Sequence, residues 1–195
     1  LIPAAAALGQ PGQDDLFEQA VLDGLATMDD TDASAVRNDL IGLAGAIRGL
    51  RFANRLTFPA ISAPNHSGIN GFSTLAELTA FLAAHQNLDG SWYWHSNTVS
   101  PTTVDDDLQT TAYAVLALLE ADNKVAPRYW DAIQLARNWL VSMQLPNGGF
   151  PVRPGGSENT EVEAEVLTAV AAVDGTIFYD DFESGDTTVW SATVP

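Results

Sequence analysis

The sequence predicts an all-α fold built from three antiparallel helical hairpins. Apolar residues recur at intervals of three and four along six segments, and clusters of Gly, Pro and Asn separate these segments. A second observation is a motif that closes two of the segments, once around Gln86 and once around Gln144. Six helices joined in antiparallel pairs are typical of stacked α-hairpin repeats, which form a solenoid or a ring.

The connections set the limits of each predicted helix. Thr31 or Asp32 can cap the second helix, and Ser73, followed by Glu77, approximates a capping box for the third. The fourth segment is apolar almost all round, so we expect it to be buried on most sides. The predicted helices run from about Asp15 to Met28, from the cap at residue 31 or 32 to Asn54, from Ser73 to His85, from Asp105 to Ala121, from Pro127 to Met143 and from Thr160 to Val173.

This pattern divides the chain into three parts. Residues 1–14 are predicted to form an extended N-terminal arm, and residues 15–175 the helical domain. Residues 176–195 are rich in β-branched and aromatic side chains around a turn at Glu183–Asp186, which predicts a short β-like arm.

Composition limits the partners. Asp and Glu number 25 against 8 Lys and Arg, and the net charge of −17 opposes binding to nucleic acid. Cysteine is absent, which excludes disulfides and thiolate zinc sites. The apolar N-terminal residues are too few to span a membrane. Because the sequence starts at Leu1 rather than Met, we expect a mature, extracellular protein whose signal peptide has been removed.

The repeated motif has the form Leu-x3-Gln-x3-Gly-x-aromatic. Glycine at a helix exit accepts the left-handed conformation, the glutamine side chain can satisfy unpaired main-chain groups, and the aromatic ring folds back on the helix end. The motif therefore predicts a structural staple rather than a catalytic site. Its residues are Gln86, Gly90 and Trp92 in the first copy and Gln144, Gly148 and Phe150 in the second.

These two copies resemble the glutamine–aromatic repeats of squalene–hopene cyclases and the related repeats of protein prenyltransferases. The resemblance covers about residues 73–173 and implies a partial α/α-toroid whose inner helices are the fourth and sixth segments. The catalytic motifs of these families do not carry over. The cyclases place Asp-x-Asp-Asp directly before Thr-Ala, whereas Leu108, Gln109 and Thr110 precede Thr111-Ala112 here. The prenyltransferase zinc site includes a cysteine, which this chain lacks.

A second resemblance lies at the C-terminus. Residues Tyr179–Ser191 are similar to the Asp-Gly-Phe-Glu-Ser-Gly-Asp…Trp-Ser tail of many exported bacterial proteins, with Asp181 where that tail usually has Gly. This resemblance implies a bacterial protein located outside the cytoplasm.

The acidic run Asp105, Asp106 and Asp107 is the sharpest candidate site. Carboxylates at a helix start can cap main-chain N–H groups, which is the interpretation we favour. Calcium binding by the same oxygens and general acid catalysis are the alternatives. No other cofactor is predicted.

Two further groups have alternative interpretations. Trp92, Tyr93 and Trp94 either cap a core or stack on a glycan or lipid. Arg48, Arg51 and Arg55 form a basic stripe, either paired with acids of the first helix and of residues 29–32 or contacting another subunit.

Three hairpins make an incomplete ring, so we expect the inner face of the fourth helix to expose apolar surface that another subunit or a chain terminus covers. The leading hypothesis is therefore an extracellular, non-catalytic structural protein that associates with itself, with a filament as one form of the assembly. The basic stripe and the tail residues Phe182 and Trp190 are the predicted contacts. The alternatives are a diverged cyclase- or prenyltransferase-like enzyme acting on an isoprenoid and a surface module that binds glycan or lipid.

Overall fold

The computed structural model describes residues 13–30, 39–66, 68–94, 107–121 and 128–174, which fold into six α-helices with no β-sheet among them. This result confirms the predicted all-α fold and its six helices. The predicted N-terminal arm, the β-like tail with Phe182 and Trp190, and Asp105 and Asp106 lie almost entirely outside the described residues. The helices are α2 (Gln13–Ala26), α3 (Asp39–Phe52), α4 (Leu75–Ala84), α5 (Leu108–Ala121), α6 (Trp130–Ser142) and α7 (Thr160–Asp174).

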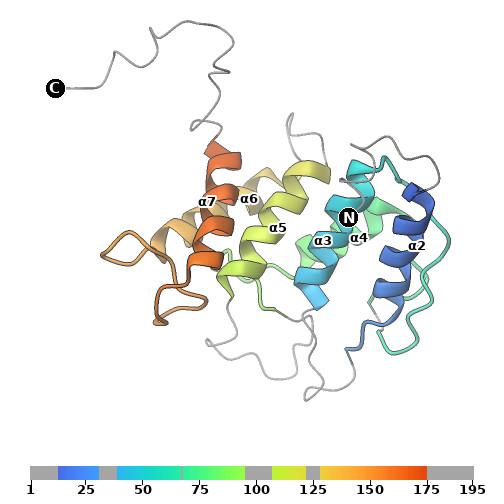
Figure 1. Cartoon of the computed structure of the whole chain (residues 1–195), viewed down its shortest axis with the longest axis horizontal. Helices are drawn as coiled ribbons and strands as arrows, with labels where there is room; N and C mark the ends of the chain where they lie inside the picture. Colours follow the sequence, from blue (N-terminus) through green and yellow to red (C-terminus); the bar gives the residue numbers. More distant parts are fainter. Residues whose placement is uncertain (1–12, 31–38, 67, 95–106, 122–127, 175–195) are drawn as a thin grey trace, which may run out of the picture.

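The helices alternate between two layers. Helices α3, α5 and α7 lie side by side in one row, and α5 packs against both of its neighbours in that row. Helices α4 and α6 form a second layer behind them, while α2 lies beside α3 at the end of the molecule opposite α7 (Figure 1). An alternation of inner and outer helices of this kind is compatible with a partial α/α-toroid, with α5 and α7 as inner helices.

Polar side chains determine where these helices begin. The hydroxyl of Thr74 accepts the N–H of Glu77, and the carboxylate of Glu77 accepts the N–H of Thr74, so this pair closes a capping box. The predicted cap at Ser73 was therefore wrong by one residue, because two consecutive hydroxyls compete for the role. α5 begins at Leu108 rather than Asp105 because the carboxylate of Asp107 accepts the N–H of Gln109 at 3.0 Å.

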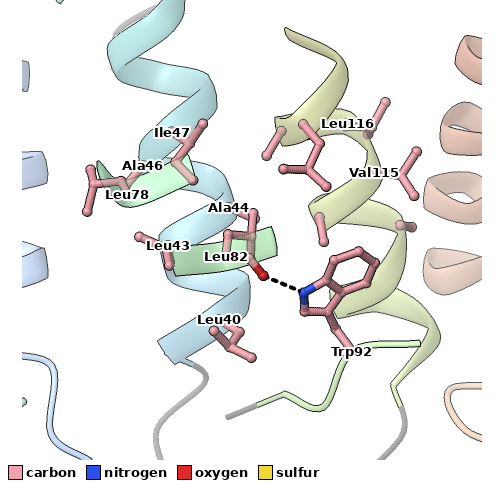
Figure 2. Packing of buried hydrophobic residues seen from close by; sticks show 14 of the residues in the cluster. Leu40, Leu43, Ala44, Ala46, Ile47, Leu78, Leu82, Trp92, Val115 and Leu116 are labelled. Carbon is pink, nitrogen blue, oxygen red and sulfur yellow. Dashed lines mark hydrogen bonds between the residues drawn. The ribbon is translucent and has the colours of Figure 1, made fainter. Parts of the chain in front are cut away.

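The core lies between the layers and is centred on α5. Ten of the fourteen residues of this helix are buried, which confirms the expectation from its apolar sequence. Figure 2 shows Trp92 at this core, where its indole Nε1 donates to the carbonyl oxygen of Leu82 on α4 at 2.8 Å. The residues of α5 that stay partly exposed are Gln109, Tyr113, Glu120 and Ala121. The expectation that its inner face exposes apolar surface is therefore wrong.

Candidate functional site

The two copies of the repeated motif adopt the same turn. Nε2 of Gln86 donates to the carbonyl oxygen of Gly90 at 3.1 Å, and Nε2 of Gln144 donates to that of Gly148 at 2.8 Å. Both glycines have positive φ, +101° and +92°, a conformation that a side chain would strain. In both copies the turn has the hydrogen bond and the glycine conformation expected of a structural staple.

The aromatic residue of each turn anchors the start of the next inner helix. Trp92 and Phe150 are buried, and their carbonyl oxygens accept the N–H groups of Asp107 and Asn159, at 3.1 and 2.9 Å. Asn159 caps α7 by accepting the N–H of Glu161 at 3.0 Å, as Asp107 does for α5 with the N–H of Gln109. Asp107 and Asn159 are therefore equivalent positions of the repeat.

Trp92 supports the core rather than a ligand. Its side chain has no exposed surface and its N–H is bonded to Leu82, so it cannot stack on a glycan or lipid. Tyr93 and Trp94 are partly exposed. Of the predicted aromatic cluster, the structure thus assigns the core role to Trp92.

Both carboxylate oxygens of Asp107 accept hydrogen bonds from its own helix. One oxygen accepts the N–H of Gln109 and the other accepts the hydroxyl of Thr110 at 2.8 Å. Burial raises the pKa of Asp107 above its ordinary value, and the bonds from Thr110 and Gln109 act in the opposite direction. The predicted capping role is confirmed for Asp107. No cluster of three or more His, Cys, Asp or Glu within the described ranges is placed to hold a metal ion.

The face formed by the inner helices α3, α5 and α7 carries polar side chains. Nε and Nη2 of Arg48 on α3 donate to the two carboxylate oxygens of Glu120 on α5, both at 3.1 Å. Arg51 donates to the carbonyl oxygen of Glu120 at 3.2 Å. Nearby, the pKa of Tyr113 is raised by desolvation and by the charge and hydrogen bond of Glu165 on α7. Side chains of α3, α5 and α7 thus tie the three inner helices together across this face.

The basic stripe is paired within the chain. Arg55 forms ion pairs with Asp15 and Glu18 of α2, which is one of the pairings expected from the sequence. Arg48 and Arg51 instead contact Glu120, a residue far along the chain that no local pattern identifies. Self-association through these arginines, Phe182 and Trp190 stays a prediction.

A pocket of about 190 Å³ lies where the start of α4 meets the end of α5 and the residues before α6. This is smaller than the roughly 300–1,000 Å³ of typical small-molecule sites. None of the described residues that line it carries a carboxylate. The lining residues are Leu56, Leu75, Ala76, Thr79, Ala121, Arg128 and Tyr129.

The contact between consecutive hairpins is the feature that sequence reasoning missed. Nε2 of Gln86 also donates to the carbonyl oxygen of Ala132 on α6 at 2.8 Å. A β-carbon on Gly90 would lie 2.6 Å from the carbonyl oxygen of Leu135, also on α6. The first motif turn thus contacts α6, the outer helix of the next hairpin, and fixes its position. At the second turn, nothing among the described residues lies within 4 Å of the corresponding position on Gly148.

Over the residues that the structure describes, the fold and site together define a stack of three α-hairpins joined by structural turns. No protein-family model matches the chain, and no solved structure matches it. Over 82 residues, 42% of its length, the chain is 37% identical to a drimenyl diphosphate synthase of Streptantibioticus cattleyicolor. This match spans 13% of that synthase. A partial similarity to a terpene synthase is compatible with the cyclase-like fold that the repeat predicts.

Proposed function

We propose that the protein is an extracellular, non-catalytic structural module that associates with itself through its end hairpins. The observation that carries this proposal is the pair of unequal turns. The first motif turn holds the next outer helix, while the second presents the same groups, Gln144 and Gly148, with no described helix against them.

The non-catalytic part of the proposal rests on the head of α5. Asp107, the one carboxylate described there, accepts bonds from its own helix through both oxygens, which is the geometry of a helix cap. Asn159, which cannot donate a proton as an acid, fills the same role on α7. Inner-face charges such as Arg48 and Glu120 neutralise each other, which suits a structural framework more than an apolar reaction cavity.

The extracellular location rests on the sequence alone. Its support is the resemblance of residues 179–191 to the tails of exported bacterial proteins. No described helix is both long and apolar enough to cross a bilayer.

Electron microscopy of the purified chain, with and without calcium, tests the structural role. We expect rings or filaments, and a dependence on calcium would point to the acidic run at residues 105–107. Uniform particles of monomer size under both conditions would contradict the proposal.

A second candidate is a diverged terpene-cyclising enzyme or a part of one, which the similarity to the drimenyl diphosphate synthase favours. Incubation of the protein with linear isoprenoid diphosphates, followed by product analysis, separates the two candidates. A cyclised product that disappears in Asp107→Asn would establish the enzyme and overturn the non-catalytic proposal.

A further inference from the structure

The inner helices α5 and α7 differ in the same way as the two motif turns: the next hairpin covers α5, and no described hairpin covers α7. On α5, the side chains of Ala112, Val115 and Leu119 are buried, with at most 3% of their surface exposed. Figure 2 shows Val115 on the side of α5 that faces α7. This row of residues is therefore part of the surface on which the next hairpin stacks.

The equivalent row on α7 has no such cover among the described residues. Aligning the caps Asp107 and Asn159 places Ala164, Leu167 and Ala171 at the corresponding positions. Leu167 is 46% exposed, Ala164 is exposed and Ala171 is partly exposed. We call these three residues, together with Gln144 and Gly148, the α7 edge. The α7 edge repeats a surface that one more α-hairpin would bury.

We propose that the α7 edge binds the α2–α3 hairpin of a second copy of this chain, head to tail. This inference rests on the proposed self-association and specifies its interface. In this arrangement, α2 of the second copy lies against the second motif turn of the first copy, and α3 of the second copy lies against α7 of the first. A contact between unlike surfaces repeats indefinitely unless its rotation closes a ring, so it produces rings or filaments.

The surface of α3 fits this position. Gly42 and Gly45 are exposed and Gly49 is partly exposed, at the same intervals of three and four residues as Ala164, Leu167 and Ala171. Nothing among the described residues lies within 4 Å of a β-carbon built on Gly45, whereas one built on Gly42 would lie 3.2 Å from Cε of Met28. Consecutive inner helices run in the same direction, so the two rows meet in register, with Leu167 packed against the glycines.

Charge also favours contact between opposite ends. Helix α2 contains four acidic residues, Asp14, Asp15, Glu18 and Asp23, and no Lys or Arg. Residues 128–159, which include α6 and the loop after it, contain two acids, Asp131 and Glu158, and three arginines, Arg128, Arg137 and Arg153. In a chain of net charge −17, α6 and this loop have a small net positive charge, which favours contact with the acidic α2 of another copy.

The absence of cysteine makes the test direct. Leu167→Cys and Gly45→Cys are prepared separately in the full chain, mixed and oxidised gently, and the disulfide-linked dimer is measured on a non-reducing gel. We expect the mixed dimer in several-fold excess over either protein alone. Leu88→Cys is the matched control for Leu167→Cys, because Leu88 is fully exposed and lies away from the α7 edge. Its mixture with Gly45→Cys should give only background.

Three results would overturn this inference. Preferential dimers of Leu167→Cys alone would indicate a symmetric contact between two α7 edges. Equal yields with Leu88→Cys, in a protein whose mass still rises with concentration, would mean that self-association uses another surface. Protection of Leu167→Cys from maleimide in a monomer would show that another part of the same chain covers the α7 edge. If the unmodified protein stays monomeric as well, the proposed function fails with the inference.

Discussion

Gly90 and the carbonyl oxygen of Leu135 approach so closely that a β-carbon on Gly90 would lie 2.6 Å from that oxygen. This contact joins the second hairpin to the third, and it occurs in only one of the two motif turns that the structure describes. Gly90→Ala should therefore suffer both the strain of positive φ and a steric clash, whereas Gly148→Ala should suffer the strain alone.

We expect Gly148→Ala to lower the free energy of unfolding by about 1–2 kcal/mol, the usual cost of a left-handed non-glycine residue. Gly90→Ala should lose roughly 1–3 kcal/mol more, as overpacked sites do. Urea unfolding followed by circular dichroism measures both values. Equal losses would mean that the contact between Gly90 and α6 contributes nothing.

Trp92→Phe tests the hydrogen bond that ties the motif turn to α4. The variant keeps an aromatic ring in the core but leaves the buried carbonyl oxygen of Leu82 without its indole donor. We expect a loss of about 1–3 kcal/mol in the free energy of unfolding. Trp130→Phe is the control, since Trp130 is 42% exposed and should change stability by less than about 0.5 kcal/mol. Similar losses in both variants would contradict the role of Trp92.

Replacing Asp107 separates capping from charge. Asn occupies the equivalent position 159, so Asp107→Asn should retain the cap, whereas Asp107→Ala should lose about 1 kcal/mol of stability. Chemical unfolding of both variants and the wild type at neutral pH provides the comparison. An alanine variant as stable as the asparagine variant would show that the side chain does not cap α5.

The raised pKa of Asp107 should also make the stability of the fold depend on pH. Because burial raises its pKa in the folded state, the carboxyl group stabilises the fold most when it is protonated, below its unfolded pKa near 3.8. That contribution is lost as the pH rises through the raised folded pKa. The stability of the wild type relative to Asp107→Asn should therefore fall with rising pH in this acidic range and then become constant. A relative stability that rises instead would contradict the raised pKa.

The ion pair between Arg48 and Glu120 should contribute little to stability by itself. About a third of the Arg48 side chain and a quarter of the Glu120 side chain are exposed, so solvent screens the attraction. A double-mutant cycle with Arg48→Met and Glu120→Gln should give a coupling energy below about 1 kcal/mol. A much larger value would mean that the inner face is more strongly desolvated than its exposure indicates.

The sequence predicted the parts of the fold that depend on local chemistry. A Gly at a helix exit and an Asp or Asn at a helix start act within a few residues, so the motif turns and the cap at Asp107 could be recognised directly. The contacts of Gln86 with Ala132 and of Arg48 with Glu120 join residues far apart in the chain, and no periodicity encodes them. The polar inner face was also missed, because a helix as apolar as α5 does not show which few residues face solvent.

Sedimentation velocity over a concentration series tests the central claim most directly. We expect the weight-average mass of the wild type to rise above the 20.7 kDa of one chain. Leu167→Glu, which puts a charge on the α7 edge, should stay near that mass, while Leu88→Glu should behave as the wild type does. A wild-type protein that remains at 20.7 kDa at every concentration would contradict the account of this chain as a self-associating structural module.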